Sequence, residues 1–159
     1  MDDIKLESKN LVHLNEIDVE KKSMKLYNNH LMDELCEFLL QQTMVFTKNT
    51  NLLNFLGISQ FSKGLINDAK ETLKMGLKIN PNDINCLNSL GLVLNETGLF
   101  NEAVLFLERA LRVQPKNTNV LNNLGINYGA RNEIQRAEEY FLKAIKINKN
   151  ADAYKNVAT

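Results

Sequence analysis

The sequence predicts an all-α protein, built as an α-solenoid of stacked antiparallel helix hairpins. Three observations predict this fold. A Leu-Gly pair recurs with a constant period, apolar residues follow helical spacing on both sides of each pair, and the chain of 159 residues contains only two prolines. Repeats of about 20–50 residues are typical of arrays in which each unit covers the apolar face of the next. We therefore expect three full repeats, an N-terminal helical cap before them and a partial fourth repeat after them.

Residues of one type recur with the same period at several other positions of the unit. We call each such set of equivalent residues a column. Small residues occupy two columns: Gly57, Gly91 and Gly125 in the first predicted helix of each unit, and Ala69, Ala103 and Ala137 in the second. Large apolar residues occupy three others: Leu53, Leu87 and Leu121; Leu56, Leu90 and Leu124; and Leu73, Leu107 and Phe141. The small residues predict a close approach of the two helices in a hairpin. The last column is expected to fill the space between successive hairpins.

The ends of the predicted helices also carry signals. A residue suited to the left-handed backbone conformation separates the two helices of each unit: Gly64, Gly98 and Asn132. Pro81 and Pro115 prevent the second helix from continuing, because proline lacks the backbone donor that a helix needs. Asp83 and Asn117 can cap the helix that follows.

These features resemble the tetratricopeptide repeat, a helix–turn–helix unit with a period of about 34 residues. The segments LNFLGISQ, LNSLGLVL and LNNLGINY match its Leu-Gly motif, and AKETL, AVLFL and AEEYF match its Ala-x3-Phe motif. Leucine replaces the usual tryptophan in every unit, and the tyrosine of the motif is kept only as Tyr128. The resemblance implies a right-handed superhelix with repeats at residues 50–83, 84–117 and 118–150.

The N-terminal part of the chain does not match the repeat motif. Residues 1–18 are expected to form a flexible arm, and residues 19–49 one or two capping helices. The apolar stripe of the cap would contain Leu31, Leu35, Phe38, Leu39 and Val45. Such a cap would cover the open face of the first repeat. A self-association or regulatory surface is the alternative interpretation of this stripe.

The C-terminal residues 151–159 resemble the start of a fourth unit. Tyr154 and Val157 correspond to Leu121 and Leu124 of the third unit, but each comes one residue earlier than the period of the repeat would place it. We expect this segment to be a partial repeat or a C-terminal capping stub.

Composition limits the classes of partner and compartment. The formal net charge is +0, and no dense run of Lys or Arg occurs, so binding to nucleic acid is not expected. No apolar run has the ~18 residues that span a bilayer. Cys36 and Cys86 are too few for a disulfide framework and are interpreted as reduced thiols. These features favour a cytoplasmic protein, with association at a membrane surface through a partner as a second option.

No set of residues indicates catalysis, a metal site or a cofactor. His13 and His30 lie outside the matched repeats and have no ligand spacing to either cysteine or to paired carboxylates. Glycine-rich phosphate loops and nucleophile-elbow motifs are also absent from the sequence. The sequence therefore predicts a protein that is not an enzyme.

The repeat resemblance implies a concave groove lined by the first helix of each unit. Its ligand-contacting positions are 2, 5, 9, 12 and 13, counted from Thr50, Ile84 and Thr118. Positions 2 and 5 are asparagine in all three units, and position 9 is aliphatic. Asn123 is added because asparagine directly precedes Leu-Gly in the repeat domain of O-linked N-acetylglucosamine transferases. The candidate partner-binding residues are Asn51, Asn54, Ile58, Asn85, Asn88, Leu92, Asn95, Asn119, Asn122, Asn123 and Ile126.

The function implied by this groove is that of a protein-interaction module that binds an extended peptide or partner segment. An asparagine amide offers both a donor and an acceptor, so it can pair with a peptide group whatever side chains the peptide carries. The alternative for the asparagine columns is composition alone, because asparagine is common throughout the chain. The alternatives for the function are a self-assembling scaffold, such as a magnetosome-associated protein that oligomerises through open repeat ends, and an accessory domain of a larger enzyme such as a glycosyltransferase.

Overall fold

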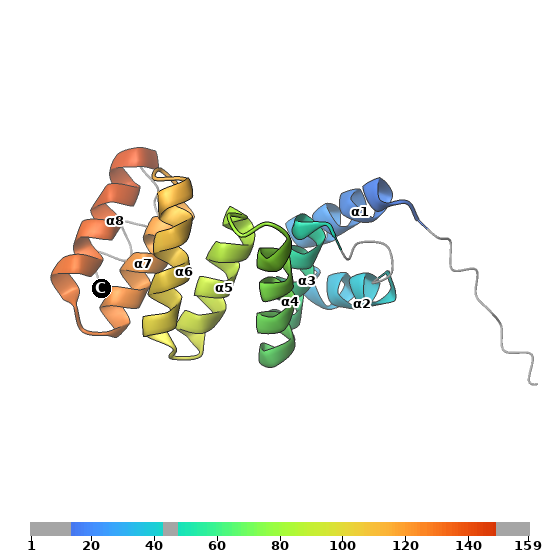
Figure 1. The fold of residues 1–159 in the computed structure, drawn as a ribbon, viewed down its shortest axis with the longest axis horizontal. Helices are drawn as coiled ribbons and strands as arrows, with labels where there is room; N and C mark the ends of the chain where they lie inside the picture. Colours follow the sequence, from blue (N-terminus) through green and yellow to red (C-terminus); the bar gives the residue numbers. More distant parts are fainter. Residues whose placement is uncertain (1–13, 43–47, 149–159) are drawn as a thin grey trace, which may run out of the picture.

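A computed structural model of the chain describes residues 14–42 and 48–148. These residues form eight α-helices and no strand (Figure 1). The helices are α1 (Glu16–Asn28), α2 (Met32–Gln41), α3 (Thr50–Ser62), α4 (Ile66–Ile79), α5 (Ile84–Glu96), α6 (Phe100–Val113), α7 (Thr118–Ala130) and α8 (Ile134–Asn148). The predicted all-α solenoid of helix hairpins is confirmed. Residues 1–13 of the expected arm, Val45 of the expected capping stripe and all of the expected partial repeat at 151–159 lie outside the described residues.

Consecutive helices pair into hairpins, and the hairpins lie side by side along the long axis of the molecule (Figure 1). The second helix of each hairpin packs on the first helix of the next: α2 on α3, α4 on α5 and α6 on α7. The first helices α1, α3, α5 and α7 also contact one another in series, whereas the second helices contact one another little if at all. The array therefore bends toward the first helices, which line its concave side.

Glycine lets the two helices of a hairpin approach closely. A Cβ atom built on Gly57 would lie 2.6 Å from Cγ of Leu73, and one built on Gly91 would lie 2.5 Å from Cγ of Leu107. Phe141 contacts Gly125 in the same way in the third hairpin. These large side chains, which the sequence pattern predicts between successive hairpins, also close the inside of their own hairpin. They do so because each glycine has no side chain, and the side chain from the facing helix fills the space that this leaves.

The turns follow the register of the repeat. Gly64, Gly98 and Asn132 have φ angles of 78°, 75° and 61°, which confirms the left-handed conformation predicted for them. Asp83 accepts a hydrogen bond from the backbone N–H of Cys86, and Asn117 accepts one from Val120. Both side chains therefore cap a helix as predicted.

The N-terminal hairpin α1–α2 keeps the same register although it lacks the Leu-Gly motif. Asn15 caps α1 and stands one full period before Asn49, which caps α3. Because of this cap, α1 begins at Glu16, inside the segment expected to be an arm. His30 has a φ of 58° and stands one full period before Gly64.

Ser23 of α1 replaces the packing glycine of the later units. It is buried, and its Oγ donates to the carbonyl of Val19 at 2.7 Å. The described residues therefore contain a fourth hairpin, α1–α2, in register with the other three.

Two apolar clusters form most of the core. One is shared by α1, α2 and α3 and includes Val19, Leu35, Leu39 and Leu52. The other runs from α4 to α8 through the leucine columns of the second and third units. Because each cluster spans neighbouring hairpins, the stacking of hairpins supplies the core that a single hairpin lacks.

Candidate functional site: the concave face

The candidate groove residues lie on α3, α5 and α7, and they differ in exposure by column. At position 2, Asn51, Asn85 and Asn119 are exposed. At position 5, Asn54, Asn88 and Asn122 are half-buried. At position 9, Ile58 and Leu92 are half-buried and Ile126 is exposed. Positions 2, 5 and 9 are three or four residues apart, so they share one face of each helix.

The side-chain oxygens of the position 5 asparagines bond to the next helix. Ser89 Oγ donates to Asn54 Oδ1 at 2.6 Å, and Asn123 Nδ2 donates to Asn88 Oδ1 at 2.9 Å. No partner among the described residues takes up the Nδ2 groups of Asn54 and Asn88. The sequence indicated an amide that offers both donor and acceptor, but the structure leaves mainly the donors free. The oxygens are occupied because position 6 of each following helix, Ser89 or Asn123, lies opposite position 5 of the helix before it and donates to it.

Asn122, the third asparagine of this column, has no such bond. Its Oδ1 is buried and finds no hydrogen-bond partner among the described residues. An unpaired buried oxygen is costly, because it has lost water and gained no donor.

Asn95 ties α5 to α7. It is 6% exposed, its Nδ2 donates to the backbone carbonyl of Asn123 at 3.0 Å, and its Oδ1 accepts from Asn127 Nδ2 at 2.6 Å. Asn127 also donates to the carbonyl of Phe100 at 2.9 Å. Both groups of the Asn95 amide are therefore used inside the protein. Sequence reasoning missed Asn127, because the equivalent residues of the other units are Ser59 and Val93. No residue type therefore recurs at this position.

The concave face extends onto α1, which sequence reasoning treated as part of a cap. Counting from Glu16 places Ile17, Glu20, Met24 and Tyr27 at positions 2, 5, 9 and 12. Ile17 is 64% exposed and Met24 49% exposed. The signal that could have located these residues is the cap Asn15, which precedes the cap of α3 by one repeat.

Glu20 continues the column of oxygens that bond to the next helix. Its Oε1 accepts a hydrogen bond from Asn51 Nδ2 at 2.9 Å. Tyr27 lies beside Phe55 of α3, with ring centroids 5.2 Å apart. The α1 end of the face is therefore apolar and partly aromatic, whereas the α5–α7 end is rich in amides.

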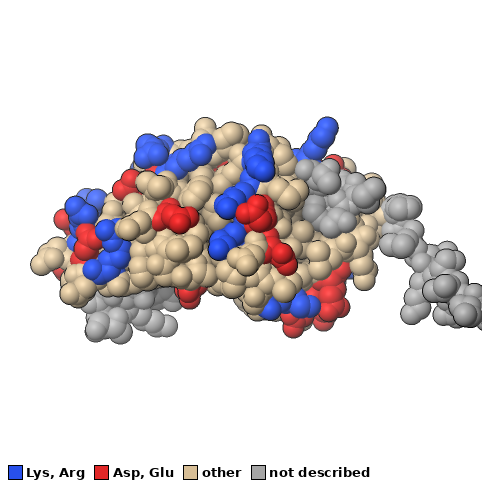
Figure 2. Space-filling model, turned by 60° about the horizontal axis from the view of Figure 1, so that its bottom comes forward, with Lys and Arg blue, Asp and Glu red and all other residues tan. Residues whose placement is uncertain are grey.

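Charged residues are scarce at the groove positions. Across α1, α3, α5 and α7, only Glu20 and Glu96 are charged at positions 2, 5, 9, 12 and 13. On the side of the molecule shown in Figure 2, basic and acidic side chains are interspersed, and neither forms a large patch of one sign. The concave face therefore presents few charged side chains at these positions.

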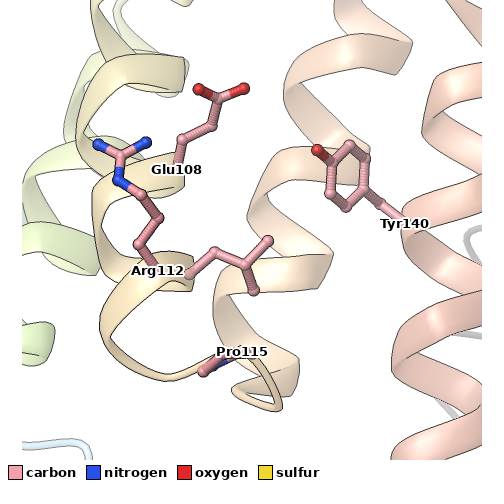
Figure 3. Close-up of a pocket in the computed structure, with 5 residues that line it drawn as sticks. Glu108, Arg112, Pro115 and Tyr140 are labelled. Carbon is pink, nitrogen blue, oxygen red and sulfur yellow. The ribbon is translucent and has the colours of Figure 1, made fainter.

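A hollow lies between α6 and α8, beside the turn that leads into α7. Figure 3 shows Glu108 and Arg112 on α6, Tyr140 on α8 with its hydroxyl turned toward α6, and Pro115 below them. Burial raises the pKa of the Tyr140 phenol, which keeps it protonated. Tyr140 stacks on Tyr128 at a centroid distance of 5.5 Å, so its ring also serves the packing of α7 on α8.

The described residues contain no cluster of three or more His, Cys, Asp or Glu side chains placed to hold a metal ion. Both cysteines are free and buried. Burial raises the pKa of the Cys86 thiol, which therefore lacks the thiolate that a reactive cysteine needs. None of the helices in residues 14–42 and 48–148 is long and apolar enough to cross a bilayer.

Comparison with known proteins agrees with this architecture. A family model described as tetratricopeptide repeat matches residues 84–114 and 118–151. The structure of TTC0263, a thermophilic protein with such repeats from Thermus thermophilus, superposes with a TM-score of 0.81 at 19% identity, covering 89% of this chain and 79% of that one. A crystal structure of MamA gives a TM-score of 0.71 at 20% identity, with 85% and 80% coverage. MamA from Desulfovibrio magneticus RS-1, residues 41 to the end, gives 0.72 at 18% identity, with 89% and 80% coverage. No curated protein sequence matches.

Proposed function

The chain belongs to the tetratricopeptide-repeat proteins, which are protein-interaction modules, and we propose that its concave face binds an extended, largely uncharged segment of a protein partner. One observation carries this proposal. The half-buried amides of Asn54 and Asn88 each hold their oxygen in a bond to the next helix, and no partner among the described residues takes up their N–H2 groups.

Such a row of donors suits the carbonyl groups of an extended peptide. A carbonyl is present at every residue, so the contact does not depend on the sequence of the partner. Each hydrogen bond contributes about 1 kcal/mol net. The aliphatic column of Ile58, Leu92 and Ile126 adds burial of apolar surface at about 25 cal/mol per Å². The sum fits modest affinity, with a Kd on the order of 1 μM.

The chemistry of the face changes along its length. At the α1 end, Ile17, Met24 and Tyr27 offer exposed apolar surface. At the α5 and α7 end, Asn85 and Asn119 offer exposed amides. We therefore expect a partner segment with aliphatic or aromatic side chains at one end and small or polar side chains at the other. Asn95 and Asn123 support the face from inside the protein. The Asn95 amide donates to the backbone carbonyl of Asn123, and the Asn123 amide donates to Asn88.

The proposal includes neither catalysis nor a cofactor. We place the protein in a reducing compartment such as the cytoplasm, which the two buried free thiols favour.

Self-assembly is the second candidate function, and exposed apolar residues on α8 favour it. Ile134 is 56% exposed and Leu142 50% exposed. The N-terminal end of the array argues against head-to-tail stacking through α1. Asp18 and Lys22 are exposed at positions 3 and 7 of α1, where the later first helices bury apolar residues against the preceding hairpin. Peptide binding therefore stays the first candidate.

The experiment that tests peptide binding uses isosteric substitutions. Dodecapeptides are selected from a random display library with the natural protein, and their Kd is measured by fluorescence polarisation. The double variant Asn54→Asp/Asn88→Asp keeps both acceptor oxygens for Ser89 and Asn123 but removes the two donors. We expect it to bind at least tenfold more weakly, because two donors are lost and two negative charges face carbonyl oxygens.

The matched control is Asn67→Asp/Asn101→Asp, which adds the same two charges on exposed residues of α4 and α6. It should bind as the natural protein does. Equal affinities for the two double variants would show that the concave amides do not hold the peptide.

A further inference from the structure

The residues at position 9 form an apolar column that runs through all four first helices. None of its members is polar or fully buried: Met24, Ile58, Leu92 and Ile126. Met24 is 49% exposed and Ile126 41% exposed, so both ends of the column meet solvent. Adjacent first helices contact each other, and the axes of packed helices lie about 8–10 Å apart. A ligand that crosses the concave face therefore meets one apolar side chain about every 8–10 Å.

This spacing favours one extended backbone conformation over another. In a β-strand, side chains on one face repeat every two residues, which is about 6.6 Å, so that successive contacts fall out of step with the column. The polyproline II helix repeats every three residues with a rise of about 3.1 Å per residue, which is about 9 Å per turn. A segment in this conformation places every third side chain on successive members of the column.

We propose that the concave face binds a proline-rich segment of another protein in the polyproline II conformation, with an aliphatic side chain at every third residue. This inference rests on the function proposed above and names the class of segment that the face accepts.

The position 5 amides beside the column offer a peptide donors rather than acceptors. The oxygens of Asn54 and Asn88 are held by the next helix, and no partner among the described residues takes up their nitrogens. The oxygen of Asn122 is buried, so it is not offered to a ligand. A peptide on this face can use its carbonyls, but its N–H groups find no acceptor at position 5. Proline has no N–H group to leave unpaired, and the carbonyls of a polyproline II helix have no partner within their own chain.

Aromatic residues at the α1 end of the face fit the same ligand. The ring centroids of Tyr27 and Phe55 lie 5.2 Å apart, and Tyr27 is 37% exposed. Proline-rich segments dock on aromatic side chains in several unrelated recognition domains. The pair therefore suits a proline ring at the end of the segment that lies over α1 and α3.

The charges at the groove positions add a basic residue to the ligand. Both charged groove residues are acidic, and one of them, Glu96, is exposed one helical turn after Leu92 on the same face of α5. A Lys or Arg beside the aliphatic residue that contacts Leu92 complements this carboxylate. A second copy of the chain cannot supply such a segment, because its two prolines, Pro81 and Pro115, are single residues in separate turns.

The test uses labelled dodecapeptides whose Kd is measured by fluorescence polarisation. The first peptide has leucine at every third residue, proline after each leucine, and serine with one lysine at the remaining positions. One comparison peptide has the same composition, shuffled so that no two leucines are three residues apart. The other keeps the leucines and replaces each proline by glycine.

We expect the first peptide to bind at least tenfold more tightly than either comparison peptide. The shuffled peptide loses the match to the column, and the glycine peptide must lose more conformational freedom on binding. Binding of the first peptide should also weaken at least tenfold in Asn54→Asp/Asn88→Asp, because its carbonyls lose their donors.

The basic residue of the ligand is tested by charge exchange. Glu96→Lys should weaken binding of the lysine peptide a few-fold, and should strengthen binding of the same peptide with glutamate in place of lysine. The matched control is Glu102→Lys, which makes the same change of charge at an exposed residue of α6 and should alter neither Kd. An unchanged Kd in Glu96→Lys would overturn the assignment of a basic residue to the partner.

Equal affinities for the first peptide and the shuffled peptide, or for the proline and glycine peptides, would overturn this inference. So would a failure of the designed peptides alone. Peptides from the random library whose binding requires Asn54 and Asn88 would in either case still support the proposed function. Failure of every peptide, selected and designed, would overturn both.

Discussion

The Leu107 side chain of α6 fills the space left by the missing side chain of Gly91 on α5. A Cβ on Gly91 would lie 2.5 Å from Leu107 Cγ, well inside van der Waals contact. Leu107 is fully buried, so its side chain has no free space into which it can move. The same contact recurs between Gly57 and Leu73. The glycine of the Leu-Gly motif thus sets the distance between the two helices of a hairpin.

We predict that Gly91→Ala destabilises the protein, although alanine is the better helix former. Overpacking of a rigid core costs about 1–3 kcal/mol, which exceeds the gain of about 1 kcal/mol from helix propensity. Unfolding in urea, followed by circular dichroism, measures the difference. The control is Gly129→Ala on α7, where the new Cβ meets only Ala137 Cβ at 3.8 Å. This variant should be as stable as the natural protein or slightly more so.

We predict that the two buried asparagines Asn95 and Asn127 act as one unit. Asn127→Ala removes the donor from Asn95 Oδ1 and from the carbonyl of Phe100, and should cost about 2–3 kcal/mol, because both acceptors stay buried. The double variant Asn95→Ala/Asn127→Ala should cost less than the sum of the two single variants. A double-mutant cycle from urea unfolding measures this coupling. Additive costs would mean that the amides do not depend on each other.

We predict that His30→Gly stabilises the N-terminal hairpin. His30 is a non-glycine residue at a φ of 58°, and the left-handed conformation costs such a residue about 1–2 kcal/mol. Gly64 and Gly98 hold the same place in the next two hairpins, with no atom near their missing side chains. Differential scanning calorimetry should show a higher Tm for His30→Gly. The reciprocal variant Gly64→Ala should show a lower Tm, and a stability loss in His30→Gly would argue against the shared register.

The sequence allowed prediction of most of the fold, because its strongest signals are steric. The Leu-Gly pairs, the left-handed residues at 64, 98 and 132 and the caps Asp83 and Asn117 each allow few alternatives for the backbone. The N-terminal hairpin was harder to recognise. Ser23 can take the place of the packing glycine by turning its hydroxyl to the helix backbone, and this exchange hides the motif.

The concave face was predictable only in outline. Periodicity located the asparagine columns, but it could not show which amide groups are used inside the protein. That depends on the offset between adjacent first helices, which places position 6 of one helix opposite position 5 of the previous one. The role of Asn95 was not predictable from periodicity either, because its partner Asn127 belongs to no column.

The buried thiol of Cys86 leads to the last prediction, which concerns stability at high pH. Burial raises the pKa of this thiol above its ordinary value of 9.0, so the folded protein keeps the proton that the unfolded chain loses. Above about pH 9 the folded state therefore binds more protons than the unfolded state, and stability falls as the pH rises. For one such group the slope rises to about 1.4 kcal/mol per pH unit. Urea unfolding at pH 8.0, 9.0 and 10.0 should show a steeper loss for the natural protein than for Cys86→Ala, in which this group is absent. Parallel pH profiles for the two proteins would show that the Cys86 thiol ionises in the folded state as readily as in the unfolded chain, against the packing of its sulfur beneath Gly76.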